Sequence, residues 1–395
     1  EANLAGHALW NYVDEVYGEK MIPNILYMTR VSKNIESGFI YVLGTTLSKI
    51  SDDFVNYYKE KYLTDEIGRI TPEFEELKIK SRKNRVYQQF KISPDGKFAA
   101  FVTNKLGQYK VYLYEIDKKR IRRIGKGSHK LNRIPDYSHP NLAWHPTSKV
   151  LAFIEEKKGD LVLNLYDVKR RRKTKRKLLN LEKVLSIAYS PNGTRMVFSA
   201  VNKGKTDLYI YNVVGNSQQQ ITNDLYDDLS PQFVNGSRKI IFSSNRPDDT
   251  LRPMGKIMPI DHDFDIYIIN LNNKKILSRI TQTPLFDEKS PSAYDNKHFT
   301  YISNKNGIYN RYITYEDSAI SHIDTSIHYR YFDIEEPISN YPRDVLELNH
   351  NANEKQFSML IKTDGRYHFF HGNNKEDYII KNELQPTHFM NYLIN

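Results

Sequence analysis

The chain has 395 residues, enough for two domains of ordinary size or for one large β domain with an appendage. It contains no cysteine, which excludes disulfide bonds, thiolate zinc sites and a cysteine nucleophile, and no run of roughly 18 apolar residues that would predict a transmembrane helix. The formal net charge is +11, but eight cations lie in the single run "KRRRKTKRK", Lys169–Lys177, so the surplus is largely local and does not indicate a generally basic surface.

The first part of the chain, from Leu4 to Glu66, has apolar residues at spacings of three and four, which predicts four helices. Gly18 and Gly44 stand where C-terminal helix caps are expected. Asn34 and Thr46 stand where N-terminal caps are expected. This region should therefore form a small helical unit of its own.

From Val86 onward the apolar pattern changes to period two and repeats. The segment "FKISPDGKFAAFVTNKLGQYKVYLYEID" aligns with "LAWHPTSKVLAFIEEKKGDLVLNLYDV" and with "IAYSPNGTRMVFSAVNKGKTDLYIYNV", and each predicts strand, turn, strand, Gly-containing loop and strand. Three less regular copies follow. A unit of roughly 40 to 50 residues with three or four strands indicates a β-propeller, because only neighbouring blades can cover both apolar faces of each sheet. The turn positions of the six copies are Gly96, Ser148, Gly193, Gly236, Lys297 and Glu354.

We therefore predict a mainly β chain, in which a small α-helical region (1–70) and a charged linker (71–85) precede a six-bladed β-propeller (86–395). A β-sandwich with similar hairpins is the alternative, but it does not explain a Gly-containing loop at a fixed offset from each turn. Propellers commonly close by pairing a strand from one terminus with strands from the other. We expect Glu75–Lys80 to be the outer strand of the last blade, with residues 376–381 as the less favoured choice.

The repeats resemble those of TolB-like propellers. The resemblance rests on "SPDGKFAAFVTN", on "SPNGTRMVFSA" with "DLYIYNV", and on "SPQFVNGSRKIIFSSNR" with "DIYIINL", and it extends over roughly Val86 to Phe370. It is weaker in the second, fifth and sixth copies. The resemblance implies a rigid six-bladed scaffold whose function lies in its loops, here chiefly an insertion in blade four and the segment Glu316–Tyr341.

The N-terminal segment is similar to the C-terminal helical part of gluzincin-like metallopeptidase domains. The similarity rests on "LAGHALWNYVDEVYGEKMIPNILYMTR" and the helical stretch that follows it. In that family the zinc site is an upstream His-Glu-x-x-His helix, whereas no His in this sequence is followed by Glu, so the family's chemistry does not carry over. Chains that join such helices to a TolB-like propeller resemble large cell-envelope proteins of the Bacteroidetes type.

The sequence predicts no catalytic residue, no metal site and no cofactor. It has no Gly-x-Ser-x-Gly elbow, no Walker loop, and no Gly-x-Gly-x-x-Gly that follows a strand. The run "DHDFD", Asp261–Asp265, gathers three carboxylates and leaves open a calcium-binding loop. Such a run more often caps a strand and faces water.

The basic tract is the most distinctive feature, and we expect it in the turn between the third and fourth strands of blade two. Matching turns of blades one and four also carry cations, and equivalent turns of a propeller lie on one face, so these side chains should share a basic rim. Such a rim suits an anionic partner: an acidic protein, lipid headgroups or lipopolysaccharide phosphate. Nucleic acid is the least favoured partner, because no aromatic residues interleave the tract. A solvated hairpin tip that prevents edge pairing remains the alternative. The predicted rim consists of Lys118, Lys119, Arg120, Lys169, Arg170, Arg171, Arg172, Lys173, Lys175, Arg176, Lys177, Lys274 and Lys275.

We expect the chain to be a non-catalytic protein-interaction module of a bacterial envelope complex, located in the periplasm or at the outer membrane. The alternative is the C-terminal and regulatory part of a zinc metallopeptidase whose His-Glu-x-x-His helix lies upstream of Glu1. A metal- or sugar-dependent lyase propeller is a third and weaker alternative.

Overall fold

The computed structural model describes residues 2–129, 136–249, 263–274, 276–323, 327–351, 356–381 and 383–394. The chain divides into two compact units. One comprises Glu1–Arg69 with Asn391–Asn395, and the other comprises Ile70–Met390. Among the residues described, no helix combines the length and the apolar character needed to cross a membrane.

The first unit contains the four predicted helices, and its caps are those expected from the sequence. The Asn34 side chain accepts a hydrogen bond from the Glu36 amide at 2.9 Å, and the Thr46 hydroxyl accepts one from the Lys49 amide at 3.2 Å. Gly44 ends its helix with a φ of 70°. The helices are α1 (Ala2–Tyr17), α2 (Met21–Ser32), α3 (Ile35–Leu43) and α4 (Leu47–Lys61), followed by a 3₁₀ turn, Leu63–Glu66. Their shared core is Tyr12, Val13, Ile25, Phe39 and Ile50.

The second unit is a six-bladed β-propeller, so the predicted fold is confirmed. Each blade is an antiparallel sheet of four strands in sequential order, apart from the last, which β1 completes. Blade one holds β2 (Val86–Ile92), β3 (Phe98–Lys105), β4 (Gln108–Glu115) and β5 (Arg120–Gly127); blade two β6 (Asn141–Trp144), β7 (Val150–Lys157), β8 (Asp160–Asp167) and β9 (Arg172–Leu178); blade three β10 (Lys183–Tyr189), β11 (Arg195–Asn202), β12 (Lys205–Asn212) and β13 (Ser217–Gln220). Blade four holds β14 (Asp228–Val234), β15 (Lys239–Ser244), β16 (Asp265–Asn270) and β17 (Leu277–Arg279); blade five β18 (Glu288–Ala293), β19 (His298–Ser303), β20 (Asn310–Ile323) and β21 (Ile327–Pro337); blade six β22 (Val345–Asn351), β23 (Gln356–Thr363), β24 (Arg366–Asn373) and β1 (Glu75–Glu76). A 3₁₀ turn, Asn374–Glu376, and helix α5 (His388–Ile394) follow.

The ring closes as predicted, with a strand from before blade one on the outside of blade six. Glu75 pairs with His371 and Glu76 with Phe370. The ladder continues where the Leu77 amide donates to the Phe369 carbonyl at 2.8 Å. Leu77 and Ile79 are buried, so the segment expected to act as a linker also supplies the closing strand.

The apolar core lies between neighbouring blades. Ile154 and Leu163 of blade two, for example, share one cluster with Met196 and Phe198 of blade three. All four side chains are fully buried, and each such burial contributes about 1.5–3 kcal/mol. The two apolar faces of each sheet are therefore covered by the adjacent sheets, which is the physical reason for a ring.

The turns between first and second strands have the structural role that their chemistry predicts. Gly96 has a φ of 68° and Gly193 a φ of 71°, which an L side chain adopts only under strain. A Cβ on Gly193 would lie 2.2 Å from the His145 Nε2 atom of blade two, so this turn also fits closely against its neighbour. The Asp95 amide donates to the Ser148 hydroxyl at 2.9 Å, which joins the turns of blades one and two.

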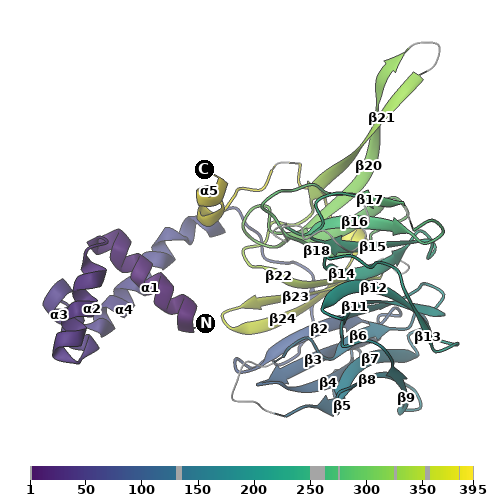
Figure 1. Cartoon of the computed structure of the whole chain (residues 1–395), viewed down its shortest axis with the longest axis horizontal. Coiled ribbons are helices and arrows are strands. Elements are labelled where there is room, and N and C mark those ends of the chain that lie inside the picture. The colour runs from purple at the N-terminus through teal and green to yellow at the C-terminus, as the bar shows by residue number, and fades with distance from the viewer. Residues whose placement is uncertain are drawn as a thin grey trace. The chain divides into compact units, whose positions relative to one another are not determined.

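Blade five departs from the repeat through a long hairpin, which we call the arm (Glu316–Ile323 and Ile327–Asp333). Strand β19 pairs with β20 only as far as Tyr315, and beyond that point β21 is the partner of β20. Figure 1 shows the two strands projecting away from the blades as a two-stranded ribbon. The segment Glu316–Tyr341, which the sequence analysis counted among the loops, thus contains regular β structure from β20 and β21.

Candidate functional site

The basic tract forms the outermost strand of blade two as well as a turn. Only Lys169–Arg171 lie in the turn after β8, whereas Arg172–Leu178 form β9. The prediction that the whole tract lies in a turn is therefore wrong. No residue of strand β8 is exposed. Its backbone groups need a partner on their outer side, and the basic segment provides that partner in spite of its charge.

One face of β9 holds blade two against blade three. The Arg176 guanidinium donates to the Tyr211 hydroxyl at 3.4 Å and also to the Val213 carbonyl oxygen. Both acceptors belong to blade three or to the turn that follows β12. Arg176 is thus a structural contact between blades and is less available to a partner than the sequence suggests.

The opposite face of β9 is also partly committed to structure. The Lys173 ammonium lies 5.1 Å from the centre of the Phe153 ring, and burial lowers the pKa of this lysine. Lys177 forms an ion pair with Asp160 at 2.7 Å. These two cations consequently bring less free charge to the surface than their number implies.

The remaining cations of the tract are exposed. Arg170 lies 4.0 Å from the Asp167 carboxylate, with 81% of its side chain exposed. We name Lys169, Arg171, Arg172 and Lys175 the basic strip. Among the residues described, none of these four side chains forms an ion pair, so the strip is the part of the tract with charge left for a partner.

The other predicted rim residues lie in the equivalent turns of their blades. Lys118 pairs with Glu115 at 2.6 Å. Lys119 occupies the turn before β5, and Arg120 begins that strand opposite Glu115. Lys274 is half-buried in the turn before β17, and Lys275 lies outside the described residues.

Strand β5 extends the basic surface in a way that the sequence analysis missed. It is the outermost strand of blade one, next to the blade that carries β9, and its sequence "RIRRIGKG" includes Arg122, Arg123 and Lys126. Arg122 lies 5.9 Å from the centre of the Tyr166 ring in blade two, whereas Arg123 and Lys126 are exposed. By contrast, the outermost strands of blades three and four read "SQQQ" and "LSR". The cations of these outer strands therefore gather on blades one and two.

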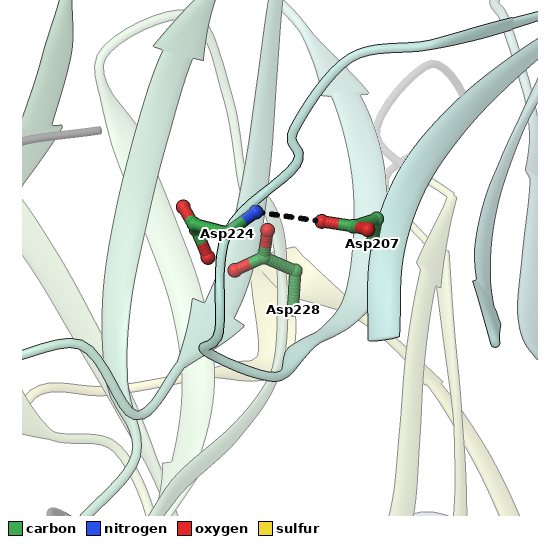
Figure 2. A group of neighbouring side chains, drawn as sticks. All are labelled: Asp207, Asp224 and Asp228. Carbon is green, nitrogen blue, oxygen red and sulfur yellow. Dashed lines mark hydrogen bonds between the residues drawn. The ribbon is translucent and has the colours of Figure 1, made fainter. Parts of the chain in front are cut away.

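A buried acidic cluster lies at the junction of blades three and four (Figure 2). Asp207, Asp224 and Asp228 place their nearest carboxylate oxygens within 4.8 Å of one another. Asp207 accepts hydrogen bonds from the Gln220 side chain at 2.9 Å and from the Asp224 amide at 3.3 Å. Burial and the nearby Asp228 charge raise the pKa of Asp207 to about 6. Three such carboxylates are ligands of the kind that hard cations prefer.

Arg246 already supplies positive charge to this cluster. Its guanidinium lies 3.0 Å from Asp224 and 2.5 Å from Asp228, and its side chain is fully buried. Figure 2 shows the three carboxylates converging from β12, from the segment before β14, and from the start of β14. The sequence analysis missed this cluster. The only available signal was the acidic run "NDLYDD" followed by "SSNR" one hairpin later.

The junction of blades four and five repeats part of this arrangement. Glu288 begins β18 as Asp228 begins β14, and it accepts hydrogen bonds from the hydroxyls of Thr281 and Thr283. Burial raises the pKa of Glu288 to about 8. Asp265 corresponds to Asp207, and it accepts from the Thr283 amide at 3.1 Å and from Arg279. Repetition at two junctions favours a structural role for these buried acids.

The suggested calcium loop is only partly visible. Asp261 and His262 lie outside the described residues. Asp263 accepts a hydrogen bond from the Leu285 amide at 2.6 Å, and Asp265 has the structural partners given above. The two described carboxylates are therefore engaged by the protein itself.

A pocket in the propeller, which we call the channel, is lined by residues from the first strand of every blade. Glu347 of blade six accepts the backbone amides of Gln89 at 2.8 Å and Phe90 at 2.9 Å in blade one, which reinforces the closure. Burial lowers the pKa of Lys91 to about 8, and the Glu347 charge opposes that shift. Burial also lowers the pKa of His350 well below its usual value, so this ring is neutral in the channel.

No protein-family model matches the chain, and no curated protein matches it either. Solved structures with a similar fold include TolB from Acinetobacter baumannii, with 14% identity and a TM-score of 0.45 over 86% of this chain and 72% of that chain. A putative TolB from Agrobacterium tumefaciens has 13% identity and a TM-score of 0.46 over 73% and 90%. The β-propeller domain of the Trilobed protease from Pyrococcus furiosus has 10% identity and a TM-score of 0.43 over 78% and 98%. Likeness at this level concerns the propeller fold alone and carries no statement about activity or partner.

Proposed function

We propose that this chain is a non-catalytic docking module that binds an acidic protein partner through the basic strip on the outer side of blade two. The observation that carries the proposal is the exposure of Lys169, Arg171, Arg172 and Lys175 on and beside an outermost strand. Their charge is not compensated by ion pairs among the described residues. Four such cations within seven residues attract an acidic surface over roughly one Debye length, about 8–10 Å at physiological salt.

The surroundings of the strip support a docking surface. Strand β5 of the adjacent blade adds Arg123 and Lys126 to the same region of the propeller wall. A strip fixed on a propeller loses little freedom on binding, because the ring already orders its strands. The buried acids of the described blades are engaged in hydrogen bonds between blades. That engagement favours a scaffold over a catalytic centre.

We place the module in the bacterial envelope, on the periplasmic side. The basis is the resemblance of its repeats to TolB-like propellers and of its helices to gluzincin-like peptidase segments, as found together in Bacteroidetes-type envelope proteins. An anionic lipid or lipopolysaccharide surface is a second source of negative charge for the same strip.

The test is a capture experiment on envelope extracts. A neutralised variant carries Lys169→Gln, Arg171→Gln, Arg172→Gln and Lys175→Gln. A matched control neutralises four exposed cations near the closing strand: Lys78, Lys80, Arg82 and Lys83. The proposal expects the unaltered chain and the control variant to capture an acidic protein that the neutralised variant does not capture. High salt should release that protein from the unaltered chain. The proposal would be overturned if the unaltered chain, the neutralised variant and the control variant captured the same proteins. It would also be overturned if the strip bound anionic lipid vesicles and no protein.

The second candidate function is the C-terminal and regulatory part of a zinc metallopeptidase. It is favoured by the separate compact helical unit, which resembles the end of such a domain. The decisive observation is the sequence encoded upstream of Glu1. A His-Glu-x-x-His helix there, with about one zinc bound by the full-length protein, would establish this function, and its absence would remove it.

A further inference from the structure

The arm of blade five carries the opposite charge to the basic strip. Its described residues include Glu316, Asp317 and Asp333, and Glu335 follows at its base. The only cation among its described residues is Arg330, whose guanidinium lies 5.8 Å from the centre of the Phe332 ring. The arm is therefore an acidic ribbon on an otherwise basic protein.

Two of these acids oppose one another in an arrangement that weakens the isolated arm. Glu316 and Asp333 are direct cross-strand partners, and like charges in that position are destabilising. Burial and the charges of Glu316 and Glu335 raise the pKa of Asp333. Among the residues described, neither Glu316 nor Asp333 forms an ion pair, whereas Glu335 lies 3.9 Å from Lys305. An incoming cation would relieve this repulsion.

The arm also exposes large apolar side chains. The exposed fractions are 55% for Ile320, 64% for Tyr331 and 38% for Phe332. A two-stranded hairpin is at most marginally stable in water on its own, and aromatic side chains are enriched in protein contact surfaces. Charge and apolar surface on the arm together fit a protein partner better than a single metal ion.

We propose that the arm of one copy docks along the basic strip of a second copy of this chain. This inference rests on the proposed function, because it names the acidic partner of the same strip. The charges are complementary: Glu316, Asp317 and Asp333 on one side, and the four cations of the strip on the other.

The arm and the strand that carries the basic strip are also similar in length, and both lie at the edge of a sheet. Strand β9 has seven residues, and the part of β20 beyond the blade, Glu316–Ile323, has eight, so each extends over roughly 23–26 Å at about 3.3 Å per residue. Among the strands described, β9 and β21 are each outermost in their sheets, and within these sheets no further strand pairs with their outer edges. Because arm and strip are different surfaces, each copy offers both, and association yields either a reciprocal two-fold dimer or a longer assembly.

Sedimentation velocity over a range of protein concentrations, in about 0.05 M and about 0.5 M salt, tests the inference. The strip-reversed variant carries Arg172→Glu and Lys175→Glu, and the arm-reversed variant carries Glu316→Lys and Asp333→Lys. A control with Lys78→Glu and Lys80→Glu changes the net charge as much as the strip reversal does. Circular dichroism verifies that each variant is folded.

The inference expects reversible self-association of the unaltered chain and of the control, weakened by high salt. Each reversal should weaken it at least tenfold. An equimolar mixture of the two reversed variants should associate again, because the unaltered arm of one meets the unaltered strip of the other. A single species at every concentration, association that survives either reversal, or a mixture that stays dissociated would overturn the inference.

Failure of the self-association inference can be distinguished from failure of the proposed function. If the unaltered chain remains monomeric but the neutralised strip still loses an acidic envelope protein, this inference fails and the proposed function stands. If self-association depends on arm and strip while captured envelope proteins are unchanged, the strip serves a second copy and the envelope partner is refuted.

Discussion

Replacing Arg246 by methionine should strongly destabilise the propeller. The Arg246 guanidinium is fully buried between Asp224 at 3.0 Å and Asp228 at 2.5 Å. Its removal leaves two carboxylates buried without a cation, and breaking a buried ion pair in this way costs about 3–5 kcal/mol. Domains are stable by only about 5–15 kcal/mol, so the variant should lose about a fifth or more of its stability. Urea unfolding at pH 7, followed by the fluorescence of Trp144 in a Trp10→Phe background, measures the loss.

Two comparisons separate the charge effect from loss of packing. Arg195→Met removes an arginine that donates to the Ser237 carbonyl oxygen at 3.1 Å and that forms no ion pair with any described residue, so it should cost no more than about 3 kcal/mol. Combining Arg246→Met with Asp224→Asn and Asp228→Asn removes the uncompensated charges and should restore much of the stability.

The pH dependence of the Arg246→Met variant has a definite sign. Burial already raises the pKa of Asp228, and the Arg246 charge opposes that rise. Without the arginine the folded-state pKa rises further, so the folded variant takes up protons at a pH where the unfolded chain does not. The variant's deficit should therefore shrink as the pH falls from about 8 to about 5. A deficit below about 1 kcal/mol at pH 7, or one that the two asparagine substitutions leave unchanged, would refute the electrostatic account.

The remaining predictions also concern stability. Burial raises the folded-state pKa of Glu288 from 4.5 to about 8, so stability should fall as the pH rises between these values; Glu288→Gln should remove that fall, and parallel pH profiles of the variant and the unaltered chain would contradict this. Gly193→Ala combines a φ of 71° with a Cβ that would lie 2.2 Å from His145, and it should lower the free energy of unfolding in urea by about 2–3 kcal/mol. Gly204→Ala combines a φ of 73° with open space around the Cβ, and it should lower that free energy by only about 1 kcal/mol. Leu77→Ala should cost about 2–5 kcal/mol and raise hydrogen exchange in β24; an effect below 1 kcal/mol would mean that the closing segment is not needed for the ring.

The features that the sequence predicted well are those set by local chemistry. The turn at Gly193 needs a positive φ, and the apolar inner strands need neighbouring sheets on both faces. Each repeat can therefore be recognised in the sequence as one blade. The closing strand was predictable because "EELKIK" alternates: Leu77 and Ile79 are buried, whereas Lys78 and Lys80 are exposed. In each case the signal lies within a few residues of the structure that it specifies.

The features that the sequence analysis missed depend on partners distant in the chain. Asp207 and Arg246 look like ordinary surface residues until blades three and four pack together and bring them to one junction. In the basic tract, every position of Arg172–Lys177 except Thr174 is cationic, so the alternation between faces is invisible. Only the register shows that Arg176 points to blade three while Lys173 lies over Phe153 in blade two.

A propeller ring needs neither a highly cationic outer strand nor a hairpin that leaves its blade. The outer strand of blade three meets the same structural need with "SQQQ", and in blade three the β12–β13 hairpin ends with its sheet. Among the residues described, β9 and the arm both depart from the repeat, and they carry opposite charges. Contacts between and within blades account for Arg176, Lys173 and Lys177 of β9, and the two proposals above assign the basic strip and the arm to contacts outside one ring. Altering either surface alone should therefore change assembly or partner binding while the stability of the blades stays the same.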